Sequence, residues 1–443
     1  MKKGGVRHFS PSFPTATGDV GERIVKKNPA AFEALKAHGV RISGFLGLQK
    51  STVGVLAMVV LVGMGERMAE RFLPIYILAL GGGAVAVGLL QAMDNLLSAL
   101  YSFPGGYLAD RVGTKKSLLV FNLVAMAGFA LAIVAPTWQA LLAGAVLFIS
   151  WSAISAPATL SLIYDVLPVS KRTMGVSMHS MVRRIPMALG PVLGGLFIGI
   201  WGEKAGVRLA FAAALTMAGV ALVLQQKMIE DDTRGRSGRD RCELTPEKNP
   251  VKLFRLMNPS LRGLLVSDVL VRFCEQIPYA FVVIWAMKTI ADPVTAVQFG
   301  LLTAIEMTTA VLVYIPVAYL ADRSAKKPFV LITFVFFTLF PLMLLFSRSF
   351  GWLVAAFILR GLKEFGEPTR KSLLMDLAPD HCKAGMFGLY YLIRDVVVSA
   401  AALGGAFLWQ VGPEVNLIAA FAFGLLGTAG FAIWGRDVKM AGR

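Results

Sequence analysis

Residues 104–111 read PGGYLADR and residues 316–323 read PVAYLADR, so six of eight positions repeat at a spacing of 212 residues. The sequence that follows each copy repeats in the same order. Pro157, Ser161 and Asp165 recur 211 residues later, and the pair Gly194 and Gly195 recurs 210 residues later. Chance does not preserve both order and spacing over such a length. The chain therefore contains two copies of one structural unit.

The composition is typical of a membrane protein. Hydrophobic residues make up 56% of the 443 positions and charged residues 16%, whereas a soluble domain carries roughly 25% charged residues. A helix needs about 20 apolar residues to cross a bilayer, and the chain holds twelve such runs. They lie near 52–78, 84–108, 117–135, 138–165, 174–200, 207–226, 262–287, 294–320, 328–346, 350–376, 385–410 and 414–435. We expect an all-α membrane protein whose twelve transmembrane helices form two pseudo-symmetric six-helix halves.

The repeat and the spans together divide the chain into five segments. We expect a tail, a first six-helix half, a polar linker, a second six-helix half and a short second tail. Their bounds are 1–50, 51–226, 227–261, 262–435 and 436–443.

The positive charge is distributed unevenly between the two sides of the membrane. Of the 44 lysines and arginines, 29 lie in the tails, the linker and the connections after even-numbered spans, whereas Lys204, Arg208, Lys288 and Arg348 lie on the opposite side. Because positive loops stay in the cytoplasm, we expect a multi-pass protein of the cell (inner) membrane with both termini cytoplasmic. The net charge of +17 then reflects topology and contact with the lipid bilayer, and not nucleic-acid binding.

Residues 106–116, GYLADRVGTKK, resemble the signature G-x-L-A-D-R-x-G-R-K of the major facilitator superfamily. The stretch lies between the second and third spans, as in that family, and residues 318–327 carry a copy that has lost both glycines. The resemblance implies the family's fold and alternating access between an outward-open and an inward-open state. It does not imply a substrate, because one fold hosts many functions. The gating residues that it implies are Gly106, Asp110, Arg111, Gly113 and Lys115, with Asp322 and Arg323 in the second copy.

We interpret Asp110 as part of a latch between the two conformations. A carboxylate there can pair with the positive end of a helix dipole and with nearby guanidinium groups, which holds the cytoplasmic side closed. Gly190 and Pro191 begin a second element, GPVLGG, that is similar to the G-P-x-x-G-G element of proton-antiporting exporters. Small residues of that kind let helices pack closely. The resemblance favours export, and ordinary close packing is the alternative.

Many charged residues lie inside the predicted spans, where each costs roughly 2.5–3.5 kcal/mol. The repeat relates Asp94 to Glu306 and Arg184 to Arg394. An acid that loses its partner in one conformation takes up a proton more readily, so such acids are candidates for proton coupling. The candidates are Glu70, Asp94 and Glu306, followed by Glu66 and Glu275.

The basic residues at the same depth are candidates for substrate binding. Arginine stays charged and suits a carboxylate or phosphate, so we expect an anionic or zwitterionic organic solute. Arg184 and Arg394 would repel one another unless Glu364 or Asp395 lies between them or an anionic ligand bridges them. The alternative is that these charges form ion pairs that only hold the bundle together. The full set of candidates is Arg184, Arg394, Arg360, Lys363, Glu364, Arg67 and Arg272.

We expect a secondary active transporter that moves a small organic solute by proton-coupled alternating access, with export favoured. The alternatives are a facilitative uniporter of the same fold, an exporter of neutral or cationic amphiphiles, and a transporter-like receptor that does not transport. The sequence shows no metal-spaced His/Cys cluster, phosphate-binding loop or nucleophile–His–acid arrangement, so an enzyme is not expected. We expect no cofactor, no metal and no nucleic acid, and a monomer as the functional unit.

The latch generates a first test. Asp110→Asn should slow transport more than Asp322→Asn does, because only the first copy keeps the glycines that allow close approach and a tight turn. Initial rates of uptake, compared at matched expression, measure the difference. A wild-type rate in Asp110→Asn would contradict the latch.

Overall fold

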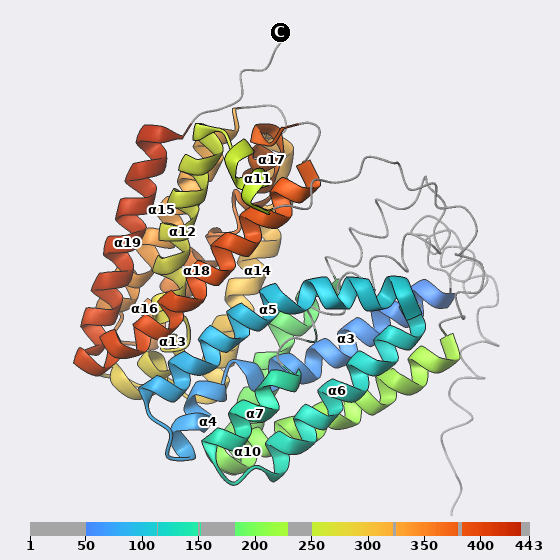
Figure 1. Ribbon diagram of the computed structural model, residues 1–443. Helices are drawn as coiled ribbons and strands as arrows, with labels where there is room; N and C mark the ends of the chain where they lie inside the picture. The colour runs from blue at the N-terminus through green and yellow to red at the C-terminus, as the bar shows by residue number, and fades with distance from the viewer. Residues whose placement is uncertain are drawn as a thin grey trace, which may run out of the picture. The chain divides into compact units, whose positions relative to one another are not determined.

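The computed structural model describes residues 50–112, 114–148, 151, 182–228, 250–321, 325–379 and 383–435. Helices make up nearly all of these residues, and short turns connect them (Figure 1). The predicted N-terminal tail, most of the linker and the C-terminal tail lie outside the described residues. The predicted fourth and fifth spans are described only in part.

The first half contains six of the described helices. They are α3 (Lys50–Glu70), α4 (Leu73–Ala79), α5 (Ala84–Val112), α6 (Thr114–Val134), α7 (Trp138–Phe148) and α10 (Arg184–Met228). α10 carries parts of two predicted spans, because its backbone turns at Gly202, where φ is 79°. Glycine adopts that left-handed region without a steric penalty. Gly202 therefore joins the fifth span to the sixth.

A short helix, α11 (Pro250–Leu256), lies in the predicted linker, before the spans of the second half. The elements that follow are α12 (Pro259–Tyr279), α13 (Val282–Ile284), the π-helix η2 (Trp285–Thr289), α14 (Ala296–Ala321), α15 (Lys326–Phe346), α16 (Phe350–Leu362), α17 (Glu367–Leu377), α18 (Lys383–Val411) and α19 (Pro413–Trp434). Seven described helices are long and apolar enough to cross a membrane, and the bent pair of α12 with the segment 282–289 makes an eighth span. The predicted fold class, an all-α membrane protein, is confirmed.

Three spans are broken rather than continuous. The first breaks between α3 and α4, the seventh between α12 and α13 with a bend of 43°, and the tenth between α16 and α17 over residues 363–366. Pro74 stands in the first turn of α4 and Pro278 in the last turn of α12. Proline lacks a backbone donor and disfavours an uninterrupted helix. The charged residues of the tenth span are therefore divided between α16, the break over 363–366 and α17.

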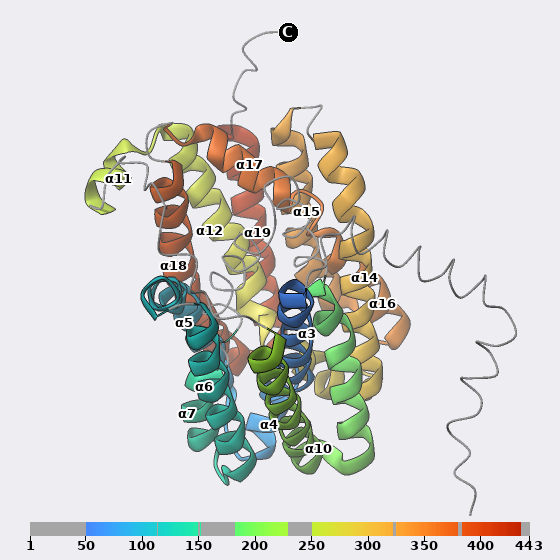
Figure 2. The same ribbon diagram turned by 90° about the vertical axis from the view of Figure 1, so that its right-hand side faces the viewer.

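The two halves pack closely near the start of α14. α5 of the first half lies along α18 of the second, and α10 lies along α14 (Figure 2). A Cβ atom on Gly195 would lie 2.4 Å from the Ala296 carbonyl oxygen, and one on Gly300 would lie 2.5 Å from the Pro191 carbonyl oxygen. The element that begins at Gly190 therefore lies where the two halves meet.

The signature lies at the end of α5 and the start of α6. α5 continues through Gly106, Asp110 and Arg111, whose side chains are not described, and Gly113 lies outside the described residues. Asp322 and Arg323 of the second copy also lie outside them.

One contact ties the start of α6 to the rest of the first half. The carbonyl of Lys115 accepts a hydrogen bond from Nε2 of the buried Gln225 at 2.9 Å. The signature is thereby anchored to the sixth span, and the latch itself stays a prediction.

The close contact of the halves generates a second test. Gly195→Ala should lower the temperature of thermal unfolding and slow transport, because the added methyl group collides with the backbone at Ala296. Overpacking of this kind costs about 1–3 kcal/mol. Gly219→Ala is the matched control, since a Cβ there meets no atom of the structure within 4 Å. Equal effects of the two substitutions would contradict the proposed close packing.

Candidate functional site

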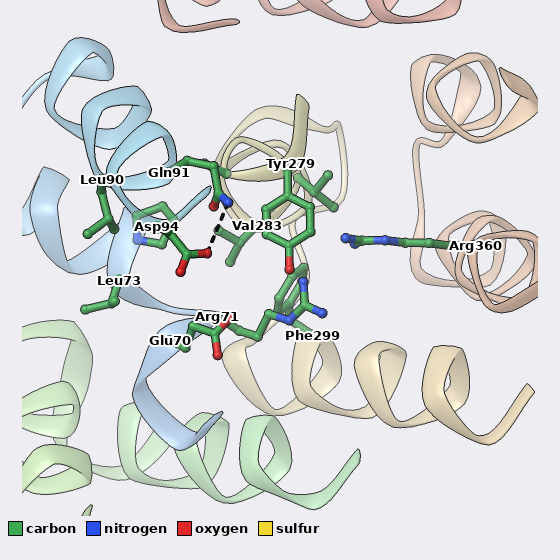
Figure 3. Close-up of a pocket in the computed structure, with 13 residues that line it drawn as sticks. Glu70, Arg71, Leu73, Leu90, Gln91, Asp94, Tyr279, Val283, Phe299 and Arg360 are labelled. Atoms are coloured by element: carbon green, nitrogen blue, oxygen red, sulfur yellow. Dashed lines mark hydrogen bonds between the residues drawn. The ribbon is translucent and has the colours of Figure 1, made fainter. Parts of the chain in front are cut away.

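A pocket lies between the two halves (Figure 3). Asp94, Glu306 and Arg360 each lie ten residues from the start of α5, α14 and α16. At 1.5 Å per residue they are about 15 Å inside the bundle, near the middle of a bilayer about 30 Å thick. The lining residues are Glu70, Arg71, Leu73, Pro74, Leu90, Gln91, Asp94, Tyr279, Ala280, Val282, Val283, Phe299 and Arg360.

The first half supplies the two acids that line this pocket. Glu70 accepts a hydrogen bond from Arg67 Nη1 at 2.7 Å, one helical turn away on α3. Asp94 on α5 accepts a hydrogen bond of 3.4 Å from Gln91 Nε2. Among the described residues Asp94 has no ion-pair partner. Glu70 is thus neutralised within its own helix, whereas Asp94 offers a carboxylate to the pocket.

The aromatic ring of Tyr279 lies close to two guanidinium groups. The Arg71 guanidinium is 5.2 Å from the ring centroid and that of Arg360 is 5.3 Å from it. Arg360 also lies 3.2 Å from Glu306 through its Nε atom. Arg71 forms no ion pair within the part of the chain that the structure describes. Arg71 therefore lines the pocket without a contact ion pair among the described residues.

Sequence reasoning did not select Arg71 or Tyr279. An offset of 205 residues relates Arg67 and Glu70 to Arg272 and Glu275. At the same offset Arg71 corresponds to Gln276, so it has no charged equivalent in the second half. That asymmetry, next to the break of the first span, was the available signal. Tyr279 stands at the end of α12, beside the break of the seventh span.

Glu306 and Glu275 are enclosed by cations of the second half. Glu306 is 1% exposed and lies 3.2 Å from Arg360 Nε and 3.6 Å from Lys363 Nζ. Glu275 contacts Lys363 Nζ at 2.7 Å and Arg272 Nη1 at 2.7 Å. Each of these carboxylates faces two cations. Asp94, by contrast, has no ion-pair partner among the described residues.

A second cluster of charges is centred on Asp268, deeper in the second half. Asp268 and Arg370 are each 1% exposed and form an ion pair. The Tyr390 hydroxyl donates to Asp268 Oδ2 at 2.9 Å, and Arg394 Nη1 lies 3.6 Å from the same oxygen. Arg370 Nη2 also contacts Glu367 Oε1 at 2.6 Å. Asp268 thereby binds cations from two different spans.

Arg184 and Arg394 each have an acidic neighbour. Arg184 Nη2 lies 3.6 Å from Glu364 Oε2, across the interface between the halves, and Arg394 Nη2 lies 2.6 Å from Asp395 Oδ1. Glu364 and Asp395 are the two acids of which one was expected to lie between the like charges of Arg184 and Arg394. Glu66 is buried on α3, one turn before Glu70.

Comparison with known proteins places the chain among membrane transporters. The sequence profile of the Major Facilitator Superfamily matches residues 55–274 and 264–441. An uncharacterised MFS-type transporter of Methanocaldococcus jannaschii is 21% identical over 371 residues, which are 80% of this chain and 87% of the relative. The uncharacterised MFS-type transporter YfkF of Bacillus subtilis is 29% identical over 164 residues, 37% of this chain and 41% of the relative.

Solved structures share the fold over most of the chain. The nucleoside transporter NupG gives a TM-score of 0.71 at 13% identity, with coverage of 87% of this chain and 100% of that one. A peptide transporter POT in complex with alafosfalin gives 0.68 at 16% identity, covering 88% and 96%. A bacterial homologue of the human lysosomal transporter Spinster, in an inward-facing and unoccupied conformation, gives 0.67 at 14% identity, covering 88% and 98%.

The Asp268 cluster generates a third test. Asp268→Asn should destabilise the protein, because it removes the charge that balances the buried Arg370, and breaking a buried pair costs about 3–5 kcal/mol. The double substitution Asp268→Asn with Arg370→Gln should recover part of that loss. Thermal unfolding in detergent measures both, with Lys371→Gln as the control, since that side chain is 50% exposed. Unfolding of Asp268→Asn at the wild-type temperature would show that the pair is dispensable.

Proposed function

Because the chain belongs to the major facilitator superfamily, we propose that it is a proton-coupled secondary transporter of a small zwitterionic solute. Transport across a membrane is the activity of that family. The finer assignment rests on one observation, which is that the pocket is lined by a cation, Arg71, and an acid, Asp94, and that neither forms a contact ion pair among the described residues.

A pocket lined by a cation and by an acid suits a ligand that carries a negative and a positive charge. Figure 3 places Asp94 and Glu70 on one side of the pocket and Arg360 on the other, with Tyr279 and Arg71 between them. A charge inside the bilayer is costly, and such residues are retained where they serve substrates or ions. A carboxylate or phosphate of the solute would contact Arg71 through its planar fork of donors. An ammonium group of the solute would contact Asp94.

Asp94 is the principal candidate for the coupling proton. Without a substrate cation beside it, a carboxylate in this setting is stabilised by taking up a proton. The substrate and the proton then compete for one site, which couples their movements. Glu306 and Glu275 each face two cations, which favours their charged form, so we rank them below Asp94 and Glu70.

We propose export as the direction, with both termini in the cytoplasm of the cell. The direction rests on the likeness of the Gly190–Pro191 element to that of proton-antiporting exporters and on its position at the interface of the halves. The orientation rests on the excess of lysine and arginine on one side. Facilitated uniport is the second candidate, favoured by the large share of charges that are already paired within the second half.

A fourth test separates coupling from binding. Asp94→Asn should abolish accumulation driven by a pH gradient in proteoliposomes while exchange of solute across the membrane continues, because the variant lacks the protonatable group. Glu70→Gln and Glu306→Gln are the companion variants, and Glu414→Gln, exposed at the start of α19, is the control. Normal proton dependence in Asp94→Asn, Glu70→Gln and Glu306→Gln alike would refute proton coupling through these acids and favour uniport.

A further inference from the structure

The short helix of the linker, α11, carries apolar and basic side chains together on its exposed face. Leu253 and Met257, one turn apart, are 6% and 2% exposed and pack into the core of the second half. Phe254, Arg255 and Leu256 lie between them in the sequence and are exposed. Figure 2 shows α11 at the outer edge of the second half, beside α18. The buried residues therefore fix which side chains α11 presents outward.

A second arginine, Arg262 near the start of α12, is held against the same face. Its Nη2 atom donates to the carbonyl oxygens of Phe254 and Arg255 at 3.3 Å each, and its guanidinium lies 5.4 Å from the Phe254 ring centroid. Among the described residues nothing pairs with its Nη1 and Nε atoms or with the Arg255 guanidinium. Both side chains are exposed. Two neighbouring guanidinium groups thus keep donors for a ligand.

The end of a membrane span lies at the level of Arg262. A Cβ atom on the adjacent Gly263 would lie 3.8 Å from Cβ of Trp434, the last residue of α19. Trp434 is 61% exposed, and Val266, one turn further along α12 than Arg262, is 53% exposed. Exposed tryptophans gather where spans leave the hydrocarbon, and exposed apolar residues within a span face lipid. Arg262 therefore lies at the boundary between the hydrocarbon and the headgroup layer.

We propose that α11 lies in the headgroup layer on the lysine- and arginine-rich side of the membrane, where Arg255 and Arg262 bind the phosphate of an anionic phospholipid. The inference requires that the chain spans a membrane and does not depend on the proposed substrate. A guanidinium binds a phosphate through a fork of donors. Phe254 and Leu256 would enter the boundary with the acyl chains, as apolar residues of interfacial helices do. A free phosphate would satisfy the arginines and leave these apolar side chains in water.

The first test measures lipid binding to the full-length protein, freed of lipid in detergent. The probes are dioctanoyl phosphatidylglycerol, dioctanoyl phosphatidylcholine and inorganic phosphate, and we expect phosphatidylglycerol to bind most tightly. Arg255→Gln and Arg262→Gln should each weaken its binding about fivefold, since one basic residue near an anionic surface contributes about that factor. Arg348→Gln is the matched control, because that exposed arginine lies between α15 and α16, at the other end of the bundle.

A second test measures the depth of α11 in a bilayer. Phe254→Cys is labelled with bimane in a background that carries Cys242→Ser and Cys382→Ser, and the protein is reconstituted in liposomes that contain phosphatidylglycerol. We expect lipid brominated near the headgroup to quench the bimane fluorescence strongly and aqueous iodide to quench it weakly, because position 254 lies at the top of the acyl chains.

Each contrary result overturns a separate part of the inference. Inorganic phosphate that binds as tightly as phosphatidylglycerol would show a site for free anions and not for lipid. Equal affinity for the two phospholipids, or equal losses in Arg255→Gln and Arg348→Gln, would remove the specific headgroup site. Quenching by iodide and not by brominated lipid would place α11 in water, where its outer face would fit a soluble protein instead. None of these results would touch the proposed substrate or its coupling to protons.

Discussion

The structure depends on one constraint, that a charge inside a bilayer needs a partner of opposite sign. An unpaired charge at the centre of a span costs roughly 2.5–3.5 kcal/mol, and the second half meets this cost with ion pairs. Asp268 binds Arg370, and Glu275 and Glu306 share Lys363. Arg71 and Asp94 both line the pocket, and within the described residues neither has an ion-pair partner. We propose that the substrate or a proton supplies the missing partner in the pocket between them.

The broken helices explain how the charges reach this arrangement. The break over 363–366 separates α16 from α17, so that Arg360 faces the pocket while Arg370 turns toward α12. Glu364 lies in the break itself and contacts Arg184 of the first half at 3.6 Å. A cross-half pair of this kind must separate whenever the halves move apart there, so under the proposed alternating access the charge balance would change with the conformation. Binding of the substrate or of a proton would then change the relative stability of the two conformations, because it changes which charges have a partner.

Much of this arrangement could be predicted from the sequence, and the remainder depends on tertiary structure. The repeat and the apolar runs predict the helical fold, and the spacing of three residues predicts the Arg67–Glu70 and Arg272–Glu275 contacts, because such residues share a helix face. The Asp268–Arg370 pair joins residues 102 positions apart. Its prediction requires the position of the break in the tenth span, which periodicity does not give. Tyr279 is singled out by the two guanidinium groups near its ring, and a lone aromatic residue in an apolar helix gives no such signal in the sequence.

The central claim is that one pocket recognises both charges of a zwitterion. The most direct measurement compares the affinity of the purified protein for a zwitterion, its N-acetyl derivative and its methyl ester. Each blocked form loses one charge-assisted contact, worth about 1.5–3 kcal/mol, so we predict that both bind at least about tenfold more weakly. Arg71→Gln should then no longer distinguish the methyl ester from the zwitterion, and Asp94→Asn should no longer distinguish the N-acetyl form. If the wild-type protein binds the methyl ester as tightly as the zwitterion, the account is contradicted.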